Sequence, residues 1–208
     1  TGGGGDIVNI QASNAVTTVE AGSGDDIIRV NYDNLGLQTF ESGLGDVLNL
    51  HGQRGADTYL VGLAGRGSAS INVHDQTPAD DRSVDTLDIF GSDQTDYFLF
   101  RPNSISSVEL DANRQPKLGG EVERVNYNGE IGATSVYGRE GDDRFIFDDT
   151  SSSLVVYGQR GDDSFQVGQS DAAAAFAGSG GPPARSAVQV DGDGVRRRCA
   201  GWTNRNND

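Results

Sequence analysis

Short stretches of alternating apolar and polar residues recur along the chain, and each follows a glycine-rich turn. Phe145 and Phe147 alternate in this way after one turn, and Phe165 and Val167 after another. A period of two that uses β-branched and aromatic residues predicts β-strands. Second short strands are predicted before several turns, over residues 17–21, 70–73, 85–90, 134–137 and 153–157. No window keeps a helical period, so the pattern predicts units of strand, tight turn, strand and connection.

The units repeat with a fixed spacing. The phrase VYGREGDDRFIF at 136–147 returns as VYGQRGDDSFQV at 156–167, so that Asp143 and Asp163 are 20 residues apart. The spacing of Asp6, Asp26 and Asp46 is also 20, whereas Asp57, Asp75 and Asp96 follow at steps of 18 and 21. One such unit cannot bury its apolar face, but stacked units cover each other. The sequence therefore predicts an all-β parallel β-helix or β-roll solenoid with coils of about 20 residues, with aspartates in columns along one edge and with Phe145 and Phe165 pointing inward at equivalent levels.

Apolar residues make up only 35% of the chain, which predicts a thin core, and the charge of the chain favours a cationic partner. The chain has 208 residues, of which 31 are acidic and 16 basic, and its net charge is -15. This charge excludes nucleic acid as a partner, because nothing here would neutralise phosphates. Carboxylates at this density repel each other unless cations lie among them, which favours a divalent metal. No apolar run approaches the roughly 18 residues of a membrane span, so no transmembrane segment is expected.

Changes in the sequence pattern divide the chain into segments. Residues 1–100 and 128–168 carry the repeats, and both are predicted to be β-solenoid. Residues 101–127 interrupt the phrase and are predicted to be an insertion or a seam. Residues 169–208 have no repeat phrase and are expected to form a linker-like or disordered tail.

The turn phrases resemble a known calcium-binding repeat. GREGDDRFI (138–146), GQRGDDSFQ (158–166) and GQRGADTYL (52–60) are similar to the nonapeptide G-G-x-G-x-D-x-U-x of RTX (haemolysin-type) proteins, where U is a large apolar residue. AGSGDDIIR (21–29) and GSDQTDYFL (91–99) are looser versions. The wider texture resembles the repeat regions of large bacterial secreted or surface proteins. The spacing is nearer 20 than the family's usual 18, and the nonapeptides mostly occur singly.

The resemblance implies Ca²⁺ at the turns. Its ligands would be the aspartates at the sixth position of each phrase and the glycine carbonyls of the turns: Asp26, Asp57, Asp96, Asp143 and Asp163, with Gly22, Gly24, Gly138 and Gly158. Asp6 and Asp46 come one place early in their phrases and are further candidates. The alternative is that all of these are ordinary aspartate-glycine turns without metal.

Two functions remain open on the sequence alone. The first is a calcium-binding structural repeat module of a large extracellular protein, serving as spacer, adhesive stalk or export-linked folding element. It would lie outside the bacterial cell or on its surface, would not be an enzyme, and would have calcium ions and cell-surface or carbohydrate ligands as partners. The alternative is a carbohydrate-active or carbohydrate-binding β-helix that uses tandem aspartates as an acid/base pair. Recurrence of the aspartates with the repeat favours the first, because an active site occurs once.

Overall fold

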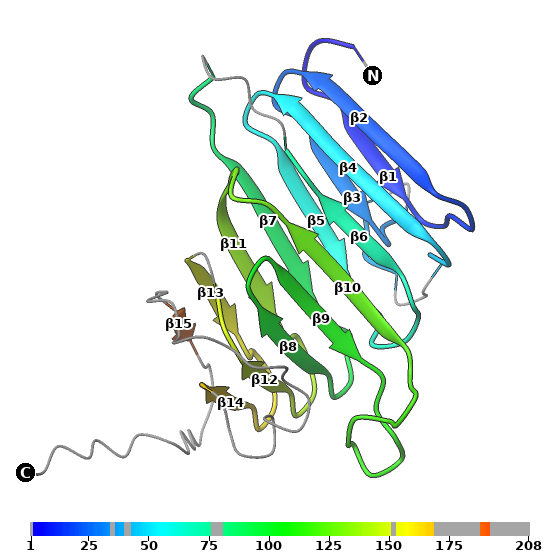
Figure 1. Ribbon diagram of the computed structural model, residues 1–208, viewed down its shortest axis with the longest axis vertical. Coiled ribbons are helices and arrows are strands. Elements are labelled where there is room, and N and C mark those ends of the chain that lie inside the picture. The colour runs from blue at the N-terminus through cyan, green and yellow to red at the C-terminus, as the bar shows by residue number, and fades with distance from the viewer. Residues whose placement is uncertain are drawn as a thin grey trace, which may run out of the picture.

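The protein is built from two β-sheets (Figure 1). The computed structural model describes residues 2–33, 36–39, 43–75, 81–150, 153–168 and 188–191. Within these ranges the chain is all-β and has no helix, so it also has no helix that could span a membrane. The prediction of an all-β fold with parallel strands is confirmed.

Successive strands alternate between the two sheets along most of the chain. Sheet 1 contains, in spatial order, β1 (Ile7–Ile10), β3 (Ile27–Val30), β5 (Thr58–Gly62), β7 (Asp85–Phe90), β11 (Ile131–Tyr137), β13 (Leu154–Tyr157) and β15 (Val188–Asp191). Sheet 2 contains β14 (Ser164–Val167), β12 (Arg144–Phe147), β8 (Tyr97–Arg101), β9 (Ser104–Val108), β10 (Val122–Tyr127), β6 (Ser70–Val73), β4 (Val47–Arg54) and β2 (Thr17–Ser23).

The two copies of the repeated phrase are direct neighbours. Val136 pairs with Val156 in sheet 1, and Phe145 pairs with Phe165 in sheet 2, both in parallel. The predicted adjacency of 136–147 and 156–167 is thus confirmed. The uniform spacing is not: the offset between equivalent aspartates of neighbouring turns is 20, 31, 28, 47 and 20 residues along the chain. Extra residues lie in the connections, which lengthen without disturbing the register of the strands.

The core lies between the sheets and consists of the inward-facing residue of each pair. Along sheet 2 it contains a continuous aromatic stack, in which the Phe98 and Phe145 ring centroids are 5.3 Å apart and those of Phe145 and Phe165 are 4.7 Å apart. Phe145 is fully buried, and Phe165 is partly buried and packs on the same core. Because equivalent side chains stack on each other, a slip in register would disrupt every layer at once.

Residues 101–127 are continuous with sheet 2. Strand β9 runs antiparallel between β8 and β10, and β10 then pairs in parallel with β6. These strands therefore join the N-terminal and C-terminal parts of the sheet, and the connection from β9 to β10 extends beyond it (Figure 1). Of the predicted tail, 169–208, only β15 lies within the described residues, and it pairs in parallel with β13.

The aromatic stack yields a stability prediction. Replacing Phe145 with alanine removes a fully buried ring between Phe98 and Phe165, and should lower the free energy of unfolding by roughly 3–5 kcal/mol. The measurement is the urea midpoint followed by circular dichroism. Phe165→Ala should cost less because Phe165 is only partly buried, and Leu118→Ala, at a side chain 98% exposed, should cost almost nothing. Equal losses for all three would contradict the stacking.

Candidate metal centre

The turns of the protein lie at two edges. Edge 1 contains the turns that lead from sheet 2 into sheet 1, and edge 2 contains those that lead from sheet 1 into sheet 2. An aspartate stands at the start of the following strand in many of these turns. Asp6, Asp26, Asp57 and Asp85 do so at edge 1, and Asp96, Asp143 and Asp163 at edge 2. The prediction that the aspartates lie along one edge is wrong, because they form one column at each edge.

Within each column the aspartates are joined by hydrogen bonds, and we call this arrangement the inner ladder. The backbone N–H of one aspartate donates to Oδ1 of the equivalent aspartate in the next turn. At edge 1 the N–Oδ1 distances are 2.7 Å from Asp6 to Asp26, 2.8 Å from Asp26 to Asp57 and 2.9 Å from Asp57 to Asp85. At edge 2 they are 2.8 Å from Asp96 to Asp143 and 3.0 Å from Asp143 to Asp163. Each carboxylate thereby satisfies a buried backbone donor of its neighbour.

The glycine that opens each phrase makes room for the second carboxylate oxygen. A Cβ atom on Gly138 would lie 2.3 Å from Oδ2 of Asp143 and 2.6 Å from the carbonyl oxygen of Gly158. Gly91 has the same relation to Oδ2 of Asp96 and to the carbonyl oxygen of Gly138. We call this space, lined by a glycine, a carboxylate oxygen and a carbonyl oxygen, a turn cradle. It explains why glycine is needed at this position whether or not a metal binds.

The preceding residue of the GDD phrase forms a second ladder on the outside. Oδ1 of Asp142 accepts the backbone N–H of Asp162 at 3.0 Å, and Oδ1 of Asp25 accepts that of Ala56 at 2.9 Å. Asp142 is exposed, and the hydrogen bond from the Asp162 N–H, together with the Arg114 guanidinium at 2.9 Å, holds the pKa of its carboxyl below the usual range. The two adjacent aspartates thus make the same kind of contact in opposite environments.

Three of the inner carboxylates have one buried oxygen that no hydrogen bond uses. Oδ2 of Asp26, of Asp57 and of Asp143 is buried and has no hydrogen-bond partner. Burial raises the pKa of Asp143 to about 8, and the neighbouring carboxylates add to this shift. Burial likewise raises the pKa of Asp57 and of Asp96 to about 6. A buried oxygen without a partner is costly, and a proton or a cation on it removes the cost.

The donor chemistry of the cradles fits a hard cation. The two atoms nearest to the Gly138 Cβ position are oxygens, one from the Asp143 carboxylate and one from the Gly158 carbonyl, and a carbon of the Phe145 ring follows at 3.0 Å. Carboxylate and carbonyl oxygens are the ligands that Ca²⁺ takes, six to eight at a time. One cradle supplies two of these. Aspartates and glycine carbonyls that were predicted as ligands thus lie near one another at two turns, Asp143 with Gly158 and Asp96 with Gly138, and calcium binding by them stays a prediction.

Other predicted ligands lie elsewhere. Asp46 is exposed, and its Oδ1 accepts the N–H of the adjacent Val47 at 2.8 Å, so Asp46 belongs to no ladder. The reason is its neighbour: Gly45 faces the Asn14 side chain of the preceding turn, where no aspartate is available. Gly22 and Gly24 have φ of 116° and 122° and pack closely on the backbone of Gly2 and Gly4. Both glycines therefore serve the stacking of turns.

Sequence reasoning missed Asp85 and misplaced Asp75. Asp85 continues the ladder after Asp57, as the register of Thr58 with Thr86 requires. The shared dipeptide Asp-Thr at 57–58 and 85–86 was the signal that could have revealed it. Asp75 falls opposite Gly52, because Leu50 pairs with Val73. It therefore occupies the place of the opening glycine, two positions after β6 ends.

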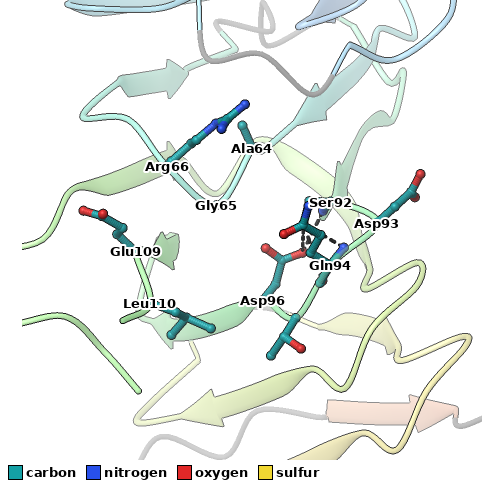
Figure 2. A pocket seen from close by; sticks show the side chains of 10 residues that line it. Ala64, Gly65, Arg66, Ser92, Asp93, Gln94, Asp96, Glu109 and Leu110 are labelled. Carbon is teal, nitrogen blue, oxygen red and sulfur yellow. Dashed lines mark hydrogen bonds between the residues drawn. The ribbon is translucent and has the colours of Figure 1, made fainter. Parts of the chain in front are cut away.

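A cavity of about 410 Å³ lies where the ladder of edge 2 ends (Figure 2). Asp96 lies at its wall, and its Oδ2 accepts both the N–H of Ser92 at 2.7 Å and the hydroxyl of Ser92 at 3.1 Å. Arg66 and Glu109 line the opposite side (Figure 2). No aromatic ring is among the lining residues. The cavity is polar and of mixed charge.

Comparisons with family models, with curated proteins and with solved structures give no match to this chain.

The raised pKa values predict how the metal-free protein responds to pH. Asp143 and Asp57 have folded-state pKa values of about 8 and about 6, above the ordinary value of 3.8. The folded chain therefore holds these protons more tightly than the unfolded chain does. The free energy of unfolding should be highest near pH 4 and fall as pH rises through 6 to 8.

The measurement is a set of urea denaturation curves in chelator between pH 5 and pH 8. We expect a loss of at least about 1.4 kcal/mol, the equivalent of one pKa unit. Asp143→Asn, which cannot ionise, should flatten the upper part of this pH dependence. A wild-type curve that rises with pH would show that the inner carboxylates are ionised without cost.

The cradle itself can be tested with a matched pair of glycines. Gly138→Ala would place Cβ 2.3 Å from Oδ2 of Asp143, and should lower the free energy of unfolding by about 1–3 kcal/mol. Gly129→Ala is the control, because no atom lies within 4 Å of its Cβ position and its φ is not positive. Thermal unfolding in chelator measures both, and a Gly138→Ala protein as stable as Gly129→Ala would contradict the cradle.

Proposed function

We propose that this chain is a calcium-binding structural repeat module, in which the two sheets form a β-solenoid of stacked coils. The alternation of strands between sheets, the parallel pairing and the ladders of equivalent residues support this architecture. Such a module is extended and made of like units, which suits a spacer, an adhesive stalk or an export-linked folding element.

One observation carries the proposal. Three buried inner-ladder oxygens have no partner: Oδ2 of Asp26, Asp57 and Asp143. At edge 2 the Asp143 oxygen borders a cradle that also contains the Gly158 carbonyl oxygen and an edge of the Phe145 ring. A chain with net charge -15 concentrates these carboxylates in columns at its two edges, where their repulsion is greatest. Calcium bound in the cradles would supply the missing partner and neutralise the columns.

Calcium dependence would also indicate where the module works. Metal binding is linked to folding, so a chain that needs calcium stays unfolded where calcium is scarce and folds where it is abundant. We therefore propose that the module works outside a bacterial cell or on its surface, as part of a large secreted or surface protein.

The carbohydrate-binding alternative has weaker support. Tyr137 and Tyr157 lie on the outer face of sheet 1, where aromatic rings could stack on sugars. However, the Tyr137 ring lies between Phe90 and Tyr157, with centroid distances of 4.9 Å to each, so its two faces are already covered. The cavity beside Asp96 has no aromatic lining. His51 has its Nδ1 atom 2.7 Å from the carbonyl oxygen of His74, a structural contact.

The decisive experiment compares two adjacent aspartates. Adding calcium to chelated wild-type protein should raise its melting temperature, and Asp143→Asn should reduce that calcium-dependent rise because it removes the buried ligand. Asp142→Asn is the matched control: its carboxylate also accepts one backbone N–H from the next turn, but it is exposed. We expect Asp142→Asn to keep most of the rise.

Isothermal titration of the same three proteins with calcium gives the affinity directly. Loss of one carboxylate ligand should weaken the affected site by about tenfold or more. If the two variants respond equally, or if calcium leaves the wild-type melting temperature unchanged, the turns are only turns and the module is a metal-free solenoid.

A further inference from the structure

One turn of edge 1 departs from the pattern in a way that creates a different site. Glycine opens the turns that contain Asp57, Asp96, Asp143 and Asp163, and a Cβ atom on each glycine would clash with the carboxylate of that aspartate. In the turn that contains Asp85, the equivalent position is occupied by Asp75, since Asp75 falls opposite Gly52. A second carboxylate therefore stands where the other turns have only space.

The consequence is a cluster of three carboxylates from neighbouring turns. Ligand atoms of Asp57, Asp75 and Asp85 lie within 4.8 Å of one another, and each of the three residues is at most 1% exposed. The Asp75 and Asp85 side chains hydrogen-bond to each other. Oδ1 of Asp85 also accepts the N–H of Asp57 at 2.9 Å, which fixes its orientation.

Neighbouring groups fix the Asp75 carboxylate. Its Oδ1 accepts the backbone N–H of Gln53 at 2.7 Å and the hydroxyl of Tyr59 at 3.3 Å. The Tyr59 hydroxyl in turn accepts the N–H of Gly52 at 2.6 Å. Asp75 is thus held by contacts from two other segments, as the ligands of a preorganised site are.

A second observation points to a ligand at the cluster. Oδ2 of Asp57 is buried and has no hydrogen-bond partner. It lies beside Gly52, whose Cβ position would be 2.1 Å from this oxygen and 2.7 Å from the Tyr59 hydroxyl. The unused oxygen therefore faces the same small space as the hydroxyl that contacts Asp75. An oxygen buried at this point needs a proton or a cation.

We propose that Asp57, Asp75 and Asp85 form a single site for a hard cation of the calcium or lanthanide class, distinct from the repeated turn cradles. Three carboxylates give this site more charge than a cradle with one. Burial favours calcium over magnesium, because magnesium dehydrates reluctantly and usually retains several waters. The proposal does not depend on calcium binding at edge 2, so the two can fail separately.

Terbium is the probe, because an excited tyrosine close to a bound terbium ion transfers energy to it and makes it luminesce. Tyr59 contacts Asp75 directly, so terbium in this site should show tyrosine-sensitised emission. Tyr59→Phe should abolish most of that emission while leaving terbium affinity, measured by calorimetry, within a few-fold of wild type. Asp75→Asn should weaken terbium binding at this site by about tenfold or more, since it removes one of three charged ligands.

The Asp75→Asn variant is suited to the test because an amide keeps an oxygen to accept the Gln53 N–H and offers an N–H to Asp85. Circular dichroism confirms that it folds. Asp143→Asn is the control for edge 2 and should leave Tyr59-dependent emission unchanged. Emission that survives in Tyr59→Phe, or terbium affinity that is the same in Asp75→Asn as in wild type, would overturn the site. In that case the Asp75–Asp85 pair holds only a proton.

Discussion

The hydrogen bond from the backbone N–H of one aspartate to Oδ1 of the next is the contact on which the turns of this protein depend. Neighbouring strands are joined by the backbone hydrogen bonds of the sheet. Turn residues lie outside that pattern, so their buried N–H groups need other acceptors. Aspartate meets this need because its short side chain reaches back to its own turn and presents an oxygen to the adjacent one. The bond between Asp96 and Asp143 spans 47 residues, and that between Asp143 and Asp163 spans 20, yet the two have the same geometry. The hydrogen bond therefore does not depend on how many residues connect two turns, but only on whether the two turns are adjacent in the stack.

The ladder changes edge in the middle of the molecule. It precedes the strands of sheet 1 as far as Asp85 and the strands of sheet 2 from Asp96 onward. The change coincides with β8, β9 and β10, where β9 runs antiparallel. Two short columns repel less than one long column would, because repulsion accumulates with each added like charge. At the point of change the turn next to Asp96 presents Gly65 and no further aspartate of the ladder, and the polar cavity lies there.

The repeating features could be predicted from the sequence. The prediction failed where a short motif does not show which other turn lies next to it in the structure. The alternation of Phe145 and Phe147 predicted a strand, and the repeated GDD phrase predicted that Asp143 and Asp163 would be stacked. Asp46 stands in a similar phrase but is exposed, because the turn beneath it offers Asn14. Asp85 was hidden because it comes ten positions after Asp75, and a motif of nine residues cannot span that distance. Strands alternate between the two sheets along most of the chain, so the edge on which a turn lies depends on how many strands come before it. A single motif does not contain this information.

The two interpretations of the repeated aspartate, as a structural turn residue and as a metal ligand, concern different atoms. Oδ1 is used by the neighbouring turn, and this accounts for the aspartate and its spacing without any ion. Oδ2 is not used by the protein in Asp57 or Asp143, and this is the atom that a proton or a cation would take. If the proposed function holds, the same carboxylate keeps the turn together through one oxygen and responds to calcium or pH through the other. Asp75 extends this division, because it adds a carboxylate where the ladder needs only a glycine. Asp75 also serves the stacking, because its Oδ1 accepts the backbone N–H of Gln53 in the adjacent turn, and what distinguishes this turn is the cluster that Asp75 forms with Asp57 and Asp85.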